Sequence, residues 1–206
     1  DVVVGESAVW VLAFDRNDRD LVLRVDPHTN QVVAVIPLTL DGYADEIAVG
    51  EGSVWVQEVG LTGGGEGDKA GDLFRIDPAT NQIAATVPDV GFSVVVGGGY
   101  AWVTDRIGDG PEFALRRVDT STNTVEGRAV PLEHYWSPIG ASGDSVWFSS
   151  YDARERVRVF RMDARTYEID AAAPPIDSLY HDAVLDPSTN SILVNLPFSV
   201  ARIDLA

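Results

Sequence analysis

Two histidines, His134 and His181, are the side chains of this sequence whose type and setting could do chemistry. Each is adjacent to a carboxylate, Glu133 in the first case and Asp182 in the second. An imidazole beside a carboxylate can hold a divalent metal ion or transfer a proton near neutral pH. The alternative is that both histidines are ordinary loop residues that hydrogen-bond to nearby backbone groups, and the sequence leaves this open. The third histidine, His28, lies in an Asp-Pro-His-Thr-Asn segment that we expect to form a turn tip remote from any site.

Both histidines belong to a set of four segments rich in aromatic and acidic residues, "LDGYADE", "DVGFS", "LEHYWSP" and "DSLYHDA". Aromatic rings stack on sugars, peptide rings or flat cations, and clustered carboxylates recruit cations. The candidate ligand-binding residues are therefore Tyr43, Asp45, Glu46, Phe92, Tyr135, Trp136, Tyr180 and Asp182. The candidate ligands for Mg²⁺ or Ca²⁺ are Glu46, His134, His181 and Asp182, and in an enzyme His134 and His181 would be catalytic. Alternatively, the aromatic rings simply plug a narrow channel.

Four tryptophans reveal the elements that must position these residues. Trp10, Trp55, Trp102 and Trp147 are separated by 45, 47 and 45 residues. An apolar strand and a tight turn precede each one, and a variable polar loop, an Arg-apolar-Asp strand, a turn and an alternating strand follow. The sequence therefore predicts units of four short strands, with no helical periodicity.

A five-residue segment recurs between the third and fourth strands of these units, as in Asp77-Pro78-Ala79-Thr80-Asn81. Asp begins a type I turn, Pro presets φ, and Asn tolerates a left-handed backbone, so we interpret the segment as a scaffold hairpin. An arginine precedes the aspartate by two residues in all five units: Arg24, Arg75, Arg117, Arg161 and Arg202. We expect these Arg–Asp pairs to form a polar ladder between units, because a buried charge needs a partner.

Four-stranded units that repeat every 40–50 residues are typical of β-propeller blades. We expect one all-β domain over residues 1–206 with about five four-stranded blades, at approximately 1–40, 41–90, 91–132, 133–177 and 178–206, the last possibly without its outer strand. A closed ring of five is the preferred arrangement. The alternative is an arc of a larger ring, which would leave two apolar blade faces bare.

Composition narrows the function classes. The chain has 45% hydrophobic residues and a formal net charge of −17, which argues against binding to nucleic acid or anionic membranes. It contains no cysteine, which excludes disulfides and thiol chemistry, and no apolar run long enough to span a membrane. It begins at Asp1, so we interpret it as a piece of a longer chain, and we expect an extracellular or extracytoplasmic location, with the cytoplasm left open.

The words "LFRIDPATNQIAATV" and "AVGEGSVWV" resemble the YVTN-type propeller repeats, and among them the streptogramin (virginiamycin B) lyase-like proteins. The resemblance covers essentially the whole chain and rests on scaffold residues. It implies a propeller, and its lyase members use a magnesium ion with His and Glu side chains on one face of the ring. The lyase pattern has no residue-by-residue match in this sequence.

Two functions follow from these observations. The first is a non-enzymatic domain that binds a small molecule, peptide or protein through the face that carries the long loops, because function concentrates on variable loops of a rigid scaffold. When the units are aligned on their first strands, which we expect to surround the central channel, one position holds three acidic residues among five: Asp1, Glu46, Ser93, Pro138 and Asp182. We therefore expect the opening of the channel on this face to be acidic. The alternative is a magnesium-dependent lyase or hydrolase. The last strand, "SVARIDL", could in addition pair with another chain through an open edge.

Overall fold

The computed structural model describes residues 1–61, 68–106, 113–132, 137–151, 156–171, 176, 182–186, 189–196 and 199–205. Within these ranges every regular element is a β-strand, and no helix long and apolar enough to cross a membrane is found there. The strands form five antiparallel sheets, each built from consecutive segments of the chain.

The first sheet contains β1 (Val2–Gly5), β2 (Ala8–Phe14), β3 (Asp20–Asp26) and β4 (Gln31–Pro37). The second contains β5 (Tyr43–Gly50), β6 (Ser53–Leu61), β7 (Asp68–Asp77) and β8 (Gln82–Gly91). The third contains β9 (Ser93–Gly97), β10 (Tyr100–Arg106), β11 (Phe113–Asp119) and β12 (Thr124–Leu132). The fourth contains β13 (Ser137–Ser142), β14 (Ser145–Tyr151), β15 (Val157–Asp163) and β16 (Ile169–Ala171). The fifth contains β17 (Asp182–Asp186), β18 (Ser191–Leu196) and β19 (Ser199–Asp204).

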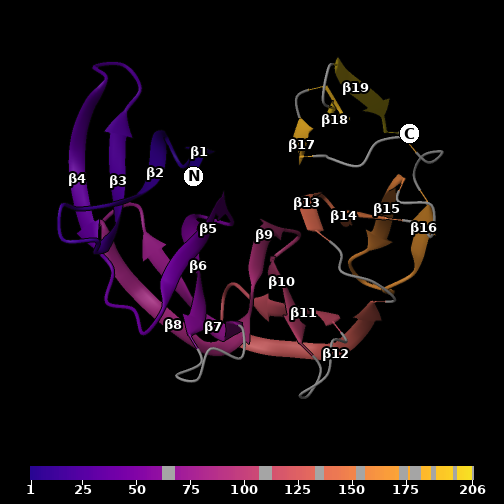
Figure 1. Cartoon of the computed structure of the whole chain (residues 1–206), viewed down its shortest axis with the longest axis horizontal. Helices are drawn as coiled ribbons and strands as arrows, with labels where there is room; N and C mark the ends of the chain where they lie inside the picture. The colour runs from indigo at the N-terminus through magenta and orange to yellow at the C-terminus, as the bar shows by residue number, and fades with distance from the viewer. Residues whose placement is uncertain are drawn as a thin grey trace.

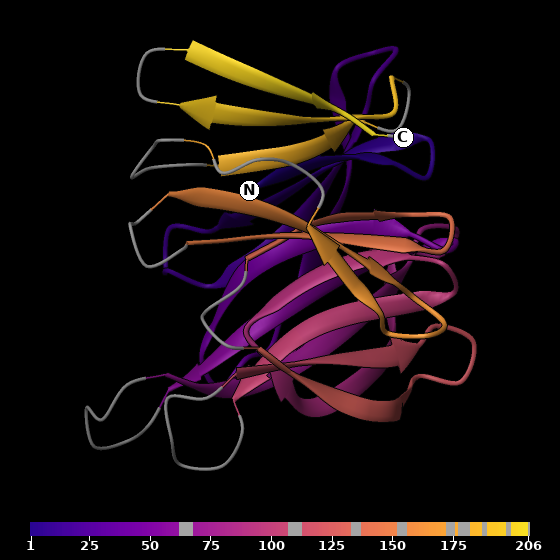
Figure 2. The same ribbon diagram turned by 90° about the vertical axis from the view of Figure 1, so that its right-hand side faces the viewer.

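The sheets follow one another round a common centre, with β1, β5, β9, β13 and β17 innermost (Figure 1). This is the arrangement of five propeller blades that the tryptophan spacing predicts. The last sheet has three strands in the order β17-β18-β19, so among the described residues the outer strand is missing, as the sequence indicated. In Figure 2 this blade, in yellow, lies at one edge of the molecule.

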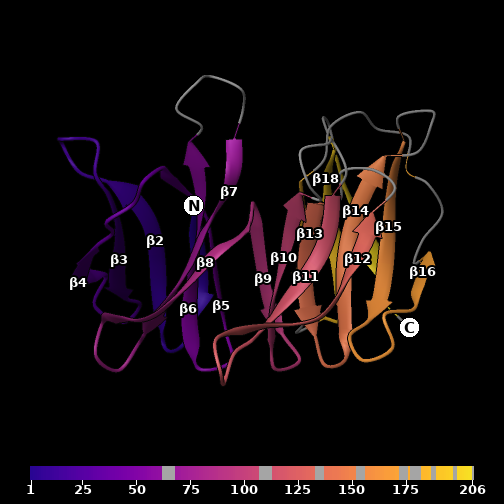
Figure 3. The same ribbon diagram turned by 90° about the horizontal axis from the view of Figure 1, so that it is seen from below.

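The two ends of the blades differ (Figure 3). One end, here called the turn end, carries the turns that join first to second and third to fourth strands. The other, here called the long-loop end, carries the connections from second to third strands and the crossovers to the next blade. Function was expected at the long-loop end.

The hairpins between third and fourth strands form as predicted. Asn30, Asn81 and Asn123 have φ of 56°, 56° and 58°, and the backbone N–H of each donates to the carbonyl of the aspartate four residues earlier at 2.8 Å. The Asp77 carboxylate accepts the backbone N–H of Ala79 at 2.8 Å and the Thr80 hydroxyl at 3.0 Å. The side chains of Asp77 and Thr80 therefore bond within the turn itself, and the hairpin is part of the scaffold.

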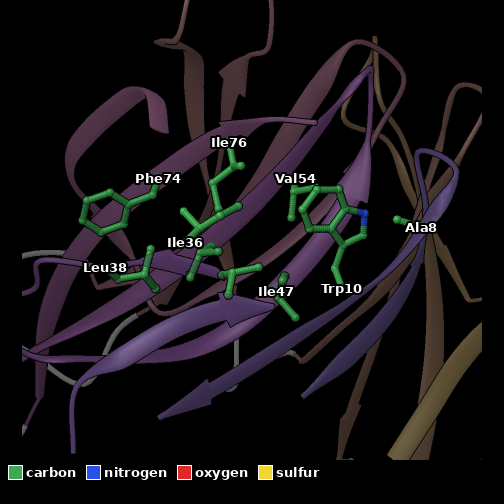
Figure 4. Packing of buried hydrophobic residues seen from close by; sticks show 10 residues of the cluster. Ala8, Trp10, Ile36, Leu38, Ile47, Val54, Phe74 and Ile76 are labelled. Carbon is green, nitrogen blue, oxygen red and sulfur yellow. The ribbon is translucent and has the colours of Figure 1, made fainter. Parts of the chain in front are cut away.

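Each of the first four blades has a face that carries the tryptophan, here called its tryptophan face, and this face packs on the opposite face of the following blade. The corresponding face of the fifth blade carries Leu193 in place of the tryptophan and is given the same name. In the first of these interfaces Ala8, Trp10 and Ile36 meet Ile47, Val54 and Ile76 (Figure 4). Equivalent clusters join the second blade to the third, the third to the fourth and the fourth to the fifth. Trp10, Trp55 and Trp102 are completely buried, and each indole N–H donates to the backbone carbonyl of a glycine at the end of its first strand.

The arginine ladder runs between blades as expected, but its acceptors differ from the prediction. Arg24 Nη1 donates to Pro78 O at 2.6 Å and to Asn81 Oδ1 at 2.9 Å, both in the turn of the next blade. Arg75 Nη1 reaches Asn123 Oδ1 at 3.1 Å, and Arg117 Nη1 reaches Ala164 O at 2.9 Å. The aspartates cap their own turns instead, because their carboxylates accept backbone N–H groups of the turn.

The closure expected for a ring of five is not made by the described residues. No core cluster among them joins the fifth blade to the first, and apolar side chains on both of these blades remain exposed. In the described part of the chain, the first and fifth blades of this five-bladed propeller therefore leave two apolar faces bare, which is the feature expected of an arc.

Candidate functional site

Tyr43, Asp45 and Glu46 begin the innermost strand of the second blade, at the long-loop end. The register of β5 against β6 shifts between Ala44 and Glu46, so Asp45 is the extra residue of a β-bulge. A bulge turns a side chain out of the regular pleat, and bulges are frequent beside functional sites. Tyr43 is 39% exposed and Asp45 is also exposed, so the structure places both candidates where a ligand could reach them.

Glu46 has a structural bond that the sequence did not suggest. Its Oε2 accepts the backbone N–H of Val94, in the innermost strand of the third blade, at 2.7 Å. Asp1, at the equivalent position of the first blade, makes the corresponding but longer contact with Ile47 N at 3.4 Å. The acidic residues at this position therefore connect consecutive innermost strands.

Phe92 links the crossover after β8 to the third blade. It is half-buried, its backbone N–H donates to Thr104 O at 2.8 Å, and its ring packs edge-to-face on Phe113 with centroids 6.4 Å apart. Phe92 therefore contributes to the packing of the long-loop end, and its ring is not a fully exposed surface for stacking.

The remaining candidates fall on chain that the structure does not describe. His134, Tyr135, Trp136, Tyr180 and His181 lie outside the described residues, and Asp182 begins β17 but its side chain is likewise outside the description. The proximity of His134 and His181 therefore stays a prediction. Among the described ranges, no group of three or more His, Cys, Asp or Glu side chains could hold a metal ion. His28 is exposed at the turn end, as expected, with Nδ1 3.4 Å from Asp26 Oδ1.

Sequence reasoning missed a set of buried polar side chains at the long-loop end of the second strands. They follow the tryptophan by two and three residues: Gln57 and Glu58, Thr104 and Asp105, Ser149 and Ser150. A polar pair directly after "Trp-x" in three blades is a signal that could have revealed them.

Glu58 shows what these residues do. Its side chain accepts the backbone N–H groups of Asp41 and Gly42 at 2.7 Å each on Oε1, and that of Asp72 at 3.3 Å on Oε2. Residues 41 and 42 form the crossover that leads to Tyr43, so this buried carboxylate fixes the approach to the candidate site. A carboxylate that accepts several amide N–H bonds is well satisfied when buried.

The third blade uses an ion pair for the same purpose. Arg116 Nη1 donates to Asp105 Oδ2 at 2.6 Å, and the Asp105 side chain is only 11% exposed. Because an incompletely solvated pair of this kind is costly to break, β10 and β11 are held together where they enter the long-loop end.

Lowered carboxylate pKa values mark hydrogen-bonded turns at both ends. At the long-loop end, the Arg19 side chain and the backbone amides of Asn17 and Arg19 lower the pKa of Asp15 from 3.8 to about 2. At the turn end, backbone amides lower the pKa values of Asp26, Asp77 and Asp163, and the Ser121 hydroxyl with backbone amides lowers that of Asp119. These shifts favour the charged form, so these five carboxylates suit a structural role and not that of a general acid.

Five antiparallel blades arranged radially define a β-propeller. Comparison of the sequence with protein-family models gives no match, and comparison with curated proteins gives none either. Comparison with solved structures finds propellers, beginning with the WD40 domain of Toxoplasma gondii coronin, at 11% identity and a TM-score of 0.65, over 98% of this chain and 54% of that one.

Two further structures are similar at the same level. KlAtg21, in a complex with the coiled coil of AgAtg16, matches 97% of this chain and 64% of its own, at 11% identity and a TM-score of 0.63. An acylaminoacyl peptidase matches 97% of this chain and 37% of its own, at 11% identity and a TM-score of 0.66. The chain thus spans between about a third and two thirds of each of these structures. Identities this low establish the fold alone.

Proposed function

We propose that the chain is a binding domain, and that its long-loop end takes a cationic peptide or protein segment beside Tyr43 and Asp45. The observation that carries this proposal is the bulge at Asp45. An exposed carboxylate and an exposed aromatic ring lie within two residues of each other on an innermost strand, where the regular pleat is interrupted. An aromatic ring and a carboxylate together suit a lysine or arginine side chain, through cation–π and charge contacts.

Rigidity of the surroundings supports a binding role. Glu58 holds the crossover before Tyr43 through two amide bonds of 2.7 Å, so little conformational freedom would be lost when a ligand docks there. The net charge of −17 would attract a cationic partner and speed the encounter. One of the similar propellers, KlAtg21, is recorded in complex with a coiled coil, so a protein partner is compatible with the fold.

A titration with defined peptides tests the proposal. We expect a lysine- and arginine-rich peptide of about ten residues to bind in isothermal titration calorimetry at low salt, and a matched peptide with glutamate in place of each basic residue to give no heat. Tyr43→Ala and Asp45→Asn should each weaken binding about fivefold or more, which corresponds to roughly 1 kcal/mol. His28→Ala, at the turn end, is the control and should bind like the parent chain.

The outcome that contradicts the proposal is equally specific. If the basic peptide fails to bind, or if Tyr43→Ala, Asp45→Asn and His28→Ala all bind it alike, the long-loop end beside Tyr43 is not the site. We further propose an extracytoplasmic location, with which the net charge of −17 is compatible. Fractionation of the source cells would test that location.

A further inference from the structure

The two blades at the ends of the arc each present an unused half of the inter-blade interface. In the four interfaces that form, the tryptophan face of one blade covers the opposite face of the next. Among the described residues, nothing packs on the tryptophan face of the fifth blade. Nothing among them packs on the opposite face of the first blade either. Residues at equivalent positions of the blades show how much of each of these two faces is exposed.

Val200 on β19 measures the exposure of the fifth blade. It pairs with Asn195, two residues before the ladder arginine, and its equivalents in the first four blades are Val22, Leu73, Leu115 and Val159. Those four are at most 1% exposed, whereas Val200 is 65% exposed. Val184, Leu193, Asn195 and Val200 also line a hollow of about 220 Å³, in which Leu193 occupies the position of the tryptophans. An apolar hollow of this kind fits a side chain from another sheet.

Val2 and Val4 on β1 give the same result for the first blade. Val2 is 57% exposed, while its equivalents Ile47 and Val94 are 4% and 3% exposed because the preceding blade covers them. Val4 is 77% exposed. Its equivalents in the second and third blades each lie against a glycine of the preceding blade.

The arginine ladder also stops at both ends. Arg24, Arg75 and Arg117 each donate to the turn of the next blade, but Arg202 bonds to Asp204 on its own strand, with its side chain 54% exposed. At the other end, Asn30 is exposed, whereas Asn81 and Asn123 accept an arginine from the blade before. The fifth blade thus has a ladder donor without a following turn, and the first blade has a turn without a preceding donor.

The two bare faces are not built to cover each other. Where innermost strands meet, an added Cβ at Gly5, Gly50 or Gly97 would lie 2.5–3.0 Å from a side chain of the next blade, and in the fourth blade Gly140 plays this part against Leu185. The fifth blade has Val184 and Asp186 at the two positions where these glycines occur. It therefore cannot approach Val4 of the first blade in the way that the other blades approach their neighbours.

We propose that the gap between the fifth and first blades is the docking site for further blades of the same repeat, carried on the same polypeptide. Propellers have about four to eight blades, so one to three more would complete the ring. Propeller domains similar over 97–98% of this chain have 36–46% of their own length outside the match, which leaves room for such blades. Every blade here is followed in sequence by its neighbour in space, so an added blade on the same chain would enter the ring in order.

A second copy of the chain fits the gap less well. Two copies would bring ten blades into one ring, beyond the usual range, and each copy carries a net charge of −17 that repels the other. The chemistry of the missing blades follows from the faces that they must meet. The blade next to β1 carries a glycine opposite Val4 and an arginine that reaches Asn30. The blade next to β17 carries an Asp-x-x-x-Asn turn that accepts Arg202.

An extended chain tests the proposal with the protein's own blades. Asp204 occupies the position of Asp77, so residues 78–171 can be fused after Asp204 in the natural register. This fusion supplies the missing outer strand of the fifth blade and adds copies of the third and fourth blades. A shorter fusion of residues 78–132 adds one blade. Each is compared with the 206-residue chain by size, by binding of the dye ANS to exposed apolar surface, and by thermal melting.

We expect the 206-residue chain to be a monomer that binds ANS, and at least one fusion to bind less ANS and to melt at least about 5 °C higher. Val200→Lys should leave the melting temperature of the 206-residue chain within about 2 °C, and should abolish the gain of the fusion. Val159→Lys, at the buried equivalent in the fourth blade, is the control and should unfold all versions. Aggregation of the 206-residue chain that a fusion cures also supports the proposal.

Three results would overturn it. A monomer that binds no ANS and is unfolded by Val200→Lys would show that the ring closes on itself. A stable dimer that Val2→Lys dissociates would show that a second copy is the occupant. Fusions that fold, yet bind as much ANS and melt no higher than the 206-residue chain, would show that blades of this repeat do not fit the gap.

Discussion

At the turn end of the propeller the same Asp-to-Asn hairpin recurs in the first three blades, whereas at the long-loop end no two blades share a sequence. At the turn end the polar side chains form one repeated pattern of hydrogen bonds: aspartate caps the hairpin, and arginine from the preceding blade bonds to it. The long-loop end uses a different buried polar pair in each of the second, third and fourth blades, and these pairs make different contacts: Glu58 bonds to backbone amides, whereas Asp105 bonds to Arg116.

The difference indicates which end can vary without loss of the fold. A repeated hairpin must fit a repeated neighbour, so a change in one blade disturbs the ladder. A loop at the long-loop end is held at its base by a buried contact within its own blade. Residues of the loop beyond that contact can therefore be substituted without affecting the other blades. Loss of Glu58, loss of Arg117, acid and divalent cations should therefore affect the chain to different degrees, in this decreasing order.

Removal of the Glu58 carboxylate should have the largest effect. Glu58→Ala leaves the amides of Asp41, Gly42 and Asp72 without their acceptor in a partly buried site, and should lower the free energy of unfolding by about 3 kcal/mol. Urea denaturation measures it. Glu51→Ala, at an exposed turn, should change stability by less than about 0.5 kcal/mol. Equal effects of the two would mean that the long-loop end has no anchored base.

Loss of one ladder arginine should have an intermediate effect. The guanidinium of Arg117 lies 4.1 Å from the ring centre of Tyr100 and 5.0 Å from that of Tyr167, and it bonds to Ala164 O. Arg117→Ala should therefore destabilise the chain by about 2 kcal/mol. Arg202→Ala, beyond the end of the ladder, should cost less than about 0.5 kcal/mol. An Arg202 variant as unstable as the Arg117 variant would show that the ladder continues into the 206-residue chain's own first blade.

Acid should weaken the turn end in a graded way. The folded pKa values of Asp77 and Asp119 lie below their ordinary value of 3.8, so the unfolded chain binds protons more readily than the folded chain. Their stabilising contribution is present above about pH 4 and is lost as the pH falls through the lower, folded values. The urea midpoint should fall between pH 5 and pH 3 for the parent, and less for Asp77→Ala and Asp119→Ala. A midpoint that does not change over this range would contradict the assignment of these carboxylates to the turns.

Divalent cations should have the smallest effect, if the chain is a binding domain without a metal. Addition of 5 mM MgCl2 or CaCl2 at constant ionic strength should shift the melting temperature by less than about 1 °C. A larger shift that His134→Ala and His181→Ala both abolish would favour a magnesium-dependent lyase or hydrolase. His28→Ala is the matched control, since His28 lies at the turn end.

The turn end could be derived from sequence because its interactions are short-range. Asp77 and Asn81 act within one five-residue hairpin, and the spacing of the tryptophans sets the blade repeat. The long-loop end could not be derived in the same way, because its bonds join residues far apart in the chain. Glu46 has the chemistry of a metal ligand, yet it bonds to the amide of Val94, 48 residues later.

Closure of the ring lay beyond sequence reasoning for a related reason. Counting units gives five blades, but whether the fifth meets the first depends on complementary shape at single positions. Val184 and Asp186 stand where a closing blade would have a glycine, and Val200 shows the consequence in its exposure.

The tryptophans give each blade-to-blade contact its own optical label. Trp10, Trp55, Trp102 and Trp147 report on the first to the fourth contact in turn, and each is at most 6% exposed. Replacing Trp136 and all but one of these four by phenylalanine would make fluorescence follow the separation of a single pair of neighbours during denaturation. A chain with free ends should then lose its terminal contacts before its central ones, whereas a completed circle should lose all of them in one transition.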